Sequence, residues 1–382
     1  MLIKVYGSAI SGIVATTITI EVNVDKGINF LLVGLPDNAV KESQQRIASA
    51  LNYYGYKIPG KKIVINMAPA DLKKEGSAYD LPLAIGILGA SEQICTDKLA
   101  DYIVMGELSL DGSLNKIKGA LPIALEAKKQ GFKGIILPKC NAKEAAIVSD
   151  LEVFGADTIL DVINFFDGQN TLERTFIDIH EEFAKSLDNY EFDFIDVKGQ
   201  ESVKRAMEVA AAGSHNIIMV GAPGSGKTML AKRLPSILPP LTIEEALETT
   251  KIHSVAGKMS VNQSIVSVRP FRNPHHTISD TALVGGGSYP QPGEISLAHN
   301  GVLFLDELPE FKRNVLEVLR QPMEERKITI ARTKQTSEYP ASFMLVAAMN
   351  PCPCGYYNHP TQACTCGLGA VNKYLNKVSG PL

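Results

Sequence analysis

The stretch Gly221-Ala-Pro-Gly-Ser-Gly-Lys-Thr228 decides the fold of the second half of this chain, because it fits the pattern G-x-x-x-x-G-K-[ST] in full. The apolar run Asn216–Val220 before it predicts a buried strand, and Met229–Leu234 after it predicts a helix. In this strand–loop–helix setting, glycines let backbone N–H groups face a phosphate at the positive end of the helix. We therefore expect ATP to be bound by the whole loop, Gly221, Ala222, Pro223, Gly224, Ser225, Gly226, Lys227 and Thr228.

Two side chains of this loop and two later carboxylates complete the predicted ATP site. Lys227 is expected to reach the β- and γ-phosphates, and the Thr228 hydroxyl to ligate Mg²⁺. The apolar run Gly301–Leu305 predicts another strand of the same sheet, and it ends in Asp306 and Glu307. We expect Asp306 to hold Mg²⁺ through water and Glu307 to polarise the attacking water as general base.

A third strand is predicted at Phe343–Met349, and it ends at Asn350. An amide at a strand tip beside the P-loop would orient the attacking water, so Asn350 joins Lys227 and Glu307 as a predicted catalytic residue. The alternative is a plain turn at the end of a strand.

Length and composition bound the class of protein. A chain of 382 residues predicts two or three domains, each large enough to bury a core. The net charge of −3 excludes a strongly basic chain that coats nucleic acid non-specifically. The longest apolar run, Leu81–Ala90, is too short to span a bilayer, and the N-terminal alternation favours a strand over a signal peptide. We therefore expect a cytoplasmic protein with no membrane partner.

The organisation along the chain predicts two α/β domains. Residues 1–167 form the first, residues 168–194 an acidic linker or short docking helix, and residues 195–382 the second. In the first domain we expect strands at 13–24, 28–35, 62–66 and 134–137, helices at 39–54, 81–91 and 119–130, and a hairpin turn at 111–112.

Four of the six cysteines lie within fifteen residues, as the pairs Cys352/Cys354 and Cys364/Cys366. Such clustering points to a metal before a disulfide, and four thiolates complete a tetrahedral zinc site. The C-x-C spacing is tighter than the usual C-x-x-C of zinc ribbons. The alternative is a set of reduced or redox-active thiols.

Three further stretches carry a resemblance to a known family. They are Arg269–Asp280, Gly285–Gly287 and Pro292–Phe311, the last running through the Asp-Glu pair. Together with the P-loop they resemble the magnesium-chelatase clade of AAA+ ATPases and, with the N-terminal domain attached, the ComM/YifB family. The resemblance covers essentially the whole chain.

The resemblance implies a Lon-protease-like domain of the ribosomal S5 domain 2-like fold, followed by a P-loop AAA+ module in a homo-oligomeric, usually hexameric, ring. It implies an ATP-fuelled motor that translocates on single-stranded or branched DNA or drives branch migration in recombination and natural transformation. Asn350 would be its sensor 1. An insertion carrying Arg269, Arg272, His275 and His276 would face the pore and follow a phosphate backbone; the alternative is that the histidines are packing or turn residues.

The resemblance also raises the question of a peptidase. Lon-type peptidases use a Ser/Lys dyad, and alignment places Ala78, not Ser77, at the nucleophile and Leu121 at the lysine. Lys116, Lys118 and Lys128 are nearby but out of register. We expect no peptidase activity and treat this domain as a structural or DNA-interaction scaffold.

The family pattern continues with a helical lid, an arginine finger and a second sensor arginine, which we expect beyond Leu382. Two other functions compete with the DNA motor. One is a chelatase-like ATPase that remodels a metal-inserting partner, and the other is remodelling or scaffolding of a protein without DNA.

Overall fold

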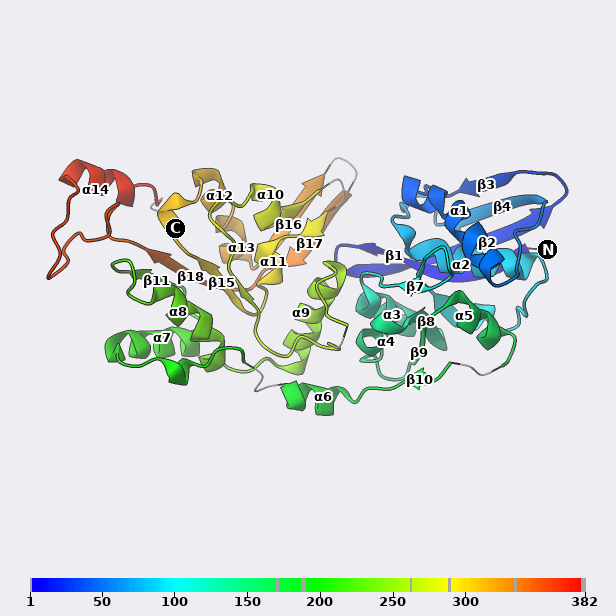
Figure 1. The fold of residues 1–382 in the computed structure, drawn as a ribbon, viewed down its shortest axis with the longest axis horizontal. Helices are drawn as coiled ribbons and strands as arrows, with labels where there is room; N and C mark the ends of the chain where they lie inside the picture. Colours follow the sequence, from blue (N-terminus) through cyan, green and yellow to red (C-terminus); the bar gives the residue numbers. More distant parts are fainter. Residues whose placement is uncertain are drawn as a thin grey trace. The chain divides into compact units, whose positions relative to one another are not determined.

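The computed structural model describes residues 2–378 apart from 170–171, 187–189, 262, 288–289 and 333–334. The chain divides into two compact units (Figure 1). Unit 1 comprises Met1–Glu182 and His253–Ile265, and unit 2 comprises Phe183–Ile252 and Val266–Leu382. Within the described residues, none of the helices combines the length and the apolar character needed to cross a bilayer.

Unit 1 is built on an eight-stranded mixed sheet in the order β10-β9-β8-β5-β1-β2-β4-β3. The strands are β1 (Leu2–Ser11), β2 (Val14–Asp25), β3 (Phe30–Val33), β4 (Lys62–Ala68), β5 (Tyr102–Val104), β8 (Gly134–Pro138), β9 (Glu152–Ala156) and β10 (Arg174–Thr175). β2 pairs antiparallel with β1 and β4, whereas β3 runs parallel to β4 and forms one edge of the sheet.

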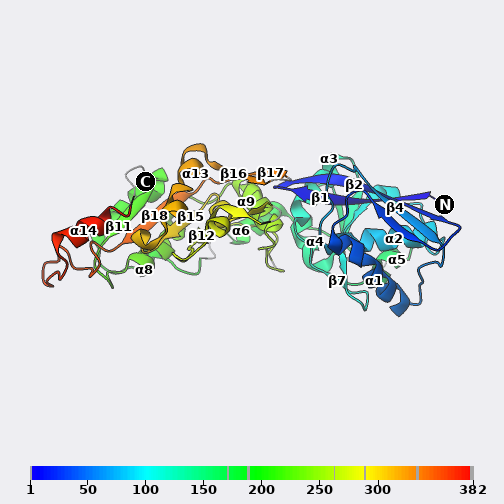
Figure 2. The same cartoon turned by 90° about the horizontal axis from the view of Figure 1, so that it is seen from above.

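The helices of unit 1 follow from sequence pattern and caps. They are α1 (Asn38–Tyr53), α2 (Asp80–Ala90), α3 (Ala120–Lys129), α4 (Lys139–Ala145) and α5 (Ile159–Phe166). Asp37 caps α1 by accepting from the Val40 N–H at 2.9 Å. All of α2 is buried, as its uninterrupted apolar composition requires, and its Gly86 leaves no room for a side chain beside Val22. Figure 2 shows the helices against the sheet from a second direction.

Unit 2 contains a four-stranded parallel sheet in the order β11-β18-β15-β12. Its strands are β11 (Ile217–Val220), β18 (Met344–Met349), β15 (Val302–Leu305) and β12 (Phe271–Arg272). Helices α7 (Glu201–Gly213) and α8 (Lys227–Arg233) cover it, with Met207 and Leu230 packed in one core with Phe304 and Val346. Because the strands are parallel, their carboxyl ends meet at one edge of the sheet.

Shorter elements complete the chain. They are β6 (Glu107–Leu108), β7 (Leu114–Asn115), α6 (Ile179–Ser186), α9 (Ile243–Val255), α10 (Asp280–Val284), β13 (Gly285–Gly286), β14 (Gln291–Pro292), α11 (Glu294–Leu297), α12 (Arg313–Glu317), α13 (Arg320–Glu325), β16 (Lys327–Arg332), β17 (Gln335–Pro340) and α14 (Leu368–Leu375). The α/β class expected from the sequence is confirmed, and β6 and β7 form the hairpin expected at 111–112.

Two features differ from the expected organisation. The acidic stretch 168–194, expected to be a linker or a short docking helix, contains α6 but also β10, which pairs antiparallel with β9 at the edge of the unit 1 sheet. The segment His253–Ile265 lies in unit 1, where the Gly119 N–H donates to the Ser254 carbonyl at 3.1 Å. Local composition did not indicate either pairing, because each depends on a partner far away in the sequence.

Candidate active site

The predicted P-loop connects β11 to α8 at the carboxyl edge of the unit 2 sheet. Gly224 and Gly226 have φ of 77° and 85°, in the left-handed region that favours glycine. Gly226 precedes the first residue of α8, and no side chain caps that helix end. Its backbone N–H groups thus remain suited to an anion.

Thr228 and Asp306 come together from α8 and from the tip of β15. The Thr228 hydroxyl donates to the Asp306 carboxylate at 2.6 Å, across 78 residues of sequence. A hydroxyl and a carboxylate oxygen in contact are the hard oxygen ligands that Mg²⁺ prefers. This pair therefore fits the predicted magnesium site.

Lys227 lies between the loop and the tip of β18. Its ammonium donates to the carbonyls of Gly221 at 2.8 Å and Ala222 at 3.0 Å, and to Asn350 Oδ1 at 3.3 Å. Burial lowers the pKa of Lys227, while the charge of Asp306 opposes that shift. The three acceptors use all three N–H bonds of the ammonium, so a phosphate would have to replace one of them.

Glu307 is an exposed residue of the site. Its backbone N–H donates to Asp306 Oδ1 at 2.9 Å, and its φ of 53° turns the chain sharply after β15. Its carboxylate lies 3.2 Å from His276 Nδ1. The His276 ring also packs on His275, with ring centroids 4.1 Å apart, and meets the edge of Phe311. Glu307 is therefore held by an imidazole that the sequence had assigned to a pore segment.

The two arginines of that predicted pore segment are engaged within unit 2. Arg272 forms a bidentate pair with Glu294, at 2.6 and 2.7 Å. Arg269 donates to the carbonyls of Pro239 and Asn300 at 2.6 and 2.7 Å. Both guanidinium groups thus brace the chain around β12 in this structure.

Gln200 is a contact to the loop that sequence patterns did not identify. Its side-chain amide donates to the Ser225 carbonyl at 3.2 Å, and its own φ is 59°. The sequence signal available for it was the Gly-Gln pair directly before α7. In the structure Gln200 stands out because a non-glycine residue with positive φ at a helix start is uncommon.

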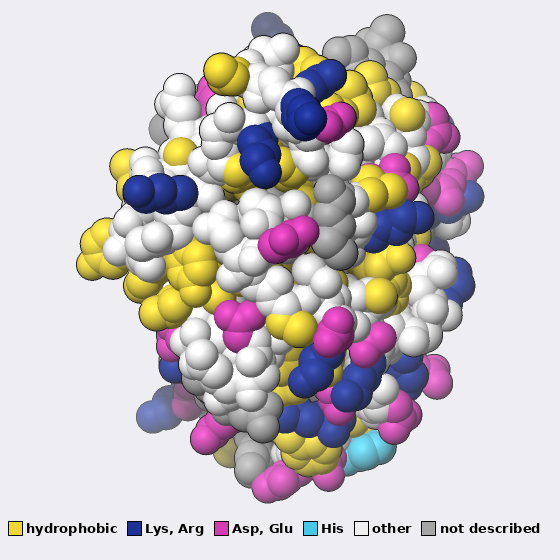
Figure 3. Space-filling view, turned by 90° about the vertical axis from the view of Figure 1, so that its right-hand side faces the viewer, with side chains coloured by type: hydrophobic (Ala, Val, Ile, Leu, Met, Phe, Trp, Pro, Cys, Tyr) yellow, Lys and Arg dark blue, Asp and Glu magenta, His cyan; other side chains and the backbone are white. Residues whose placement is uncertain are grey.

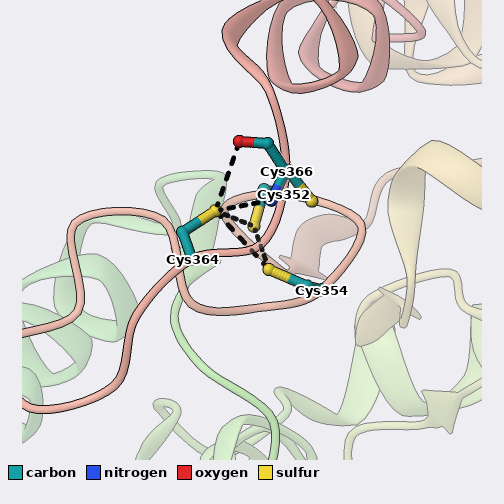
Figure 4. A group of neighbouring side chains, drawn as sticks. All are labelled: Cys352, Cys354, Cys364 and Cys366. Atoms are coloured by element: carbon teal, nitrogen blue, oxygen red, sulfur yellow. Dashed lines mark hydrogen bonds between the residues drawn. The ribbon is translucent and has the colours of Figure 1, made fainter.

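The four clustered cysteines meet in the loop after β18 (Figure 4). Cys352 Sγ lies 3.3 Å from Cys354 Sγ and 3.7 Å from Cys364 Sγ, and all four sulfur atoms lie within 4.8 Å of one another. All four thiols are free of disulfides. Sulfur atoms at about 2.3 Å from a tetrahedral zinc ion lie about 3.8 Å apart, so the cluster has the size of a zinc site.

Backbone groups favour the thiolate form of Cys354 in this cluster. The N–H groups of Tyr356 and Thr365 lower the pKa of the Cys354 thiol to about 5. The Tyr357 N–H donates to Cys352 Sγ at 3.3 Å. Thiolate ligands are the form that binds zinc.

The Ser/Lys positions of unit 1 lack a dyad arrangement. The Ser77 hydroxyl donates to the Glu107 carboxylate, and Leu121 is buried in α3. Lys116 donates to the Met259 carbonyl. In the part of the chain that the structure describes, no hydrogen bond links Ser77 to a lysine.

Comparisons with known proteins agree with the geometry of unit 2. A family model described as magnesium chelatase, subunit ChlI, matches residues 193–382, and a second, described as subunit ChlI of Mg-chelatase, matches residues 20–141. The chain is 48% identical over 378 residues to the uncharacterized protein YifB of Escherichia coli, covering 99% of this chain and 73% of that protein.

Two other relatives differ in how much they share. The competence protein ComM of Haemophilus influenzae is 46% identical, over 99% of this chain and 74% of its own length. The magnesium-chelatase 67 kDa subunit of Chlorobaculum parvum is 25% identical over 162 residues, which is 41% of this chain and 23% of that subunit. Near full-length similarity therefore extends to YifB and ComM, whereas the similarity to this chelatase subunit is partial.

Proposed function

The chain belongs to the YifB/ComM family of magnesium-chelatase-like AAA+ ATPases, and from this premise we propose that it hydrolyses ATP to drive DNA translocation or branch migration in recombination and natural transformation. The observation that carries the ATPase is the meeting of Lys227, Thr228, Asp306 and Asn350 at one sheet edge. The DNA substrate is supported by the relative named competence protein ComM.

Each residue of the site has a part in this proposal. The backbone of Gly221–Gly226 and Lys227 hold the phosphates, and Thr228 and Asp306 hold Mg²⁺, which neutralises charge that develops on the phosphates. Glu307 accepts a proton from the attacking water, and Asn350 orients that water. Both side chains lie just after strands, β15 and β18, that end beside the P-loop.

The test is the ATPase rate with and without single-stranded and branched DNA. We expect DNA to raise the rate, and Lys227→Ala and Glu307→Gln each to lower it about 100-fold or more. A P-loop-dependent rate that ignores every DNA would leave the ATPase standing and contradict the DNA motor. It would favour the alternative, ATP-dependent remodelling of a protein partner, to which the partial similarity with a chelatase subunit points.

We also propose that Cys352, Cys354, Cys364 and Cys366 hold a structural Zn²⁺, supported by the mutual distances of their sulfur atoms. Elemental analysis of protein purified without added metal should find one zinc ion per chain, and Cys364→Ser should lose it. Protein that is folded and active without zinc would contradict this proposal.

Finally, we propose that the working form is a cytoplasmic hexameric ring. Sedimentation velocity with Mg²⁺ and a slowly hydrolysed ATP analogue should show a single large species. A monomer at all protein concentrations would contradict the ring.

A further inference from the structure

Four lysines gather at one edge of unit 1, around the start of β4. Lys61 and Lys62 begin β4, and Lys62 pairs across the sheet with Asp25, the last residue of β2. The loop that follows β2 carries Lys26 and returns beside β4, where the Ile63 N–H donates to the Asn29 carbonyl at 2.7 Å. Residues separated by 35 positions thus become neighbours.

Two of these lysines, Lys26 and Lys61, line a hollow. It has a volume of about 480 Å³ and is lined by Val24, Asp25, Lys26, Gly27, Ile28, Gly60 and Lys61. Glycines on both sides leave the backbone accessible, and Ile28 is 87% exposed. A hollow with two ammonium groups and open backbone suits a phosphate.

The positive charge of this edge is not neutralised within the chain. Among the described residues, none of Lys26, Lys57, Lys61 and Lys62 takes part in an ion pair, whereas Lys4 on β1 pairs with Glu21 at 3.5 Å. Asp25 is the acidic residue of the hollow, and its Oδ1 accepts from the Lys26 backbone N–H at 2.7 Å. Lysines that form no ion pair with a carboxylate can contact the phosphates of a polyanion.

An exposed aromatic ring lies on the same connection. Tyr53 ends α1 and is 68% exposed, and its ring meets the edge of Tyr54 at 5.1 Å and 83°. Tyr54 is fixed in turn, because its backbone N–H donates to Leu51 and its ring lies against Gly112. The ring of Tyr53 therefore contacts Tyr54 and leaves most of its surface exposed to solvent.

The connection between Tyr53 and Lys61 is held in place rather than loose. Gln93 Nε2 donates to the Lys57 carbonyl at 2.9 Å, and the Lys57 N–H donates to Gln93 Oε1 at 3.3 Å. Even fully extended, eight residues span at most about 28 Å, so Tyr53 and the hollow fall within one short stretch of nucleotides.

We propose that this Lys–Tyr surface, formed by Lys26, Tyr53, Lys57, Lys61 and Lys62, binds single-stranded DNA. The lysines contact phosphates and Tyr53 stacks on a base, which only an unpaired strand presents. This inference rests on the proposed DNA substrate and assigns unit 1 a direct part in holding it. Figure 3 views this end of the chain, and in its upper part Lys and Arg side chains lie among hydrophobic and uncharged ones and a few acidic ones.

The charge is tested by the salt dependence of binding to fluorescent oligothymidine. Each phosphate contact contributes about 0.7 to the slope of log affinity against log salt, so Lys26→Ala/Lys61→Ala should lower that slope by about 1.4. The control is Lys129→Ala/Lys143→Ala on α3 and α4, two exposed lysines without an ion pair in the described chain, and it should keep the slope. Equal slopes in both double variants would overturn the surface.

The aromatic contact is tested separately. Tyr53→Ala should weaken oligothymidine binding at least about fivefold with an unchanged salt slope, and Tyr53→Phe should bind as the native chain does. The loss should be absent with blunt duplex DNA, where no base is free to stack. An affinity for oligothymidine unchanged by Tyr53→Ala would remove stacking from the proposal.

The failure of this surface is distinguishable from failure of the DNA motor. If the native chain binds DNA and DNA stimulates its ATPase, yet Lys26→Ala/Lys61→Ala and Tyr53→Ala bind DNA as the native chain does, the motor stands and the surface is wrong. If the native chain binds neither oligothymidine nor branched DNA, both proposals fall. Melting temperature and basal ATPase confirm that each variant is folded.

Discussion

The carboxylate of Glu307 is held from two sides at the residue scale. Its backbone adopts a φ of 53°, a conformation that costs a non-glycine residue on the order of 1 kcal/mol or more. His276 Nδ1 then lies 3.2 Å from the carboxylate. A strained turn that aims a carboxylate toward an imidazole indicates that the orientation of this group matters.

We predict that His276→Ala lowers the maximal ATPase rate about tenfold while the affinity for ATP stays the same, because a misplaced general base slows chemistry rather than binding. Steady-state kinetics and equilibrium binding of a fluorescent nucleotide separate the two effects. His276 would then be a positioning residue for Glu307.

The matched control is His275→Ala. The His275 ring Nδ1 lies 2.9 Å from the Thr277 hydroxyl and not against Glu307, so its loss should change the rate far less. An equal loss of ATPase rate in both variants would mean that the two histidines only stabilise the segment. The rate of His276→Gln should in that case be no higher than that of His276→Ala.

The sequence predicted the loop, Asp306 and Asn350 because each stands at the end of an apolar strand, and parallel strands end at one edge. It did not predict the contact of His276 with Glu307. That contact joins segments 31 residues apart, and no local period encodes it. The role given to Arg272 likewise overlooked Glu294, its partner 22 residues away.

At the scale of elements, the cysteine loop packs against the P-loop. Gly355 follows Cys354 with a φ of 88°, and a Cβ atom there would lie 2.4 Å from Pro223 Cδ. Two loops from opposite ends of unit 2 in sequence therefore share one contact. The cysteine loop therefore lies against the P-loop as well as directly after the strand tip at Asn350.

We predict that Gly355→Ala destabilises unit 2 by more than about 1 kcal/mol and weakens ATP binding, because the new methyl group displaces Pro223 and the backbone is strained. Urea denaturation and nucleotide titration measure both. The control is Gly367→Ala, which has a φ of −68° and nothing within 4 Å of its new methyl group. Equal behaviour of the two variants would exclude the contact.

β4, whose buried residues alternate, and α2, whose apolar run is unbroken, were both predicted well. β10 was missed because two residues carry no period, and its pairing with β9 is decided by the sheet. The hairpin of β16 and β17 was also missed, although Ile328 and Ile330 alternate with exposed residues in β16, because β17 is mostly polar and only the pairing with it defines the hairpin.

At the scale of the whole molecule, each of the two units has its own stabilising contacts. Every residue of the ATP site lies in unit 2, whereas a buried ion pair braces unit 1. Asp80 is fully buried, and Arg46 Nε donates to its Oδ2 at 2.7 Å. Burial raises the pKa of Asp80, and Arg46 opposes that shift.

We predict that Arg46→Ala lowers the free energy of unfolding of unit 1 by on the order of 3 kcal/mol, since it leaves a buried carboxylate without its cation. Without Arg46 the folded-state pKa of Asp80 rises further above its unfolded value. The stability of the variant is then greatest at acidic pH and falls as pH rises through that folded pKa. Urea denaturation at mildly acidic and neutral pH measures the difference.

Arg46→Ala/Asp80→Asn removes the charge and should lose this pH dependence, while nucleotide affinity at unit 2 stays native in both variants below the unfolding transition. A pH dependence that persists in the double variant would place its source elsewhere. Nucleotide affinity that falls together with the stability of unit 1 would mean that the ATP site depends on the fold of unit 1, and the assignment of that site to unit 2 alone would be wrong.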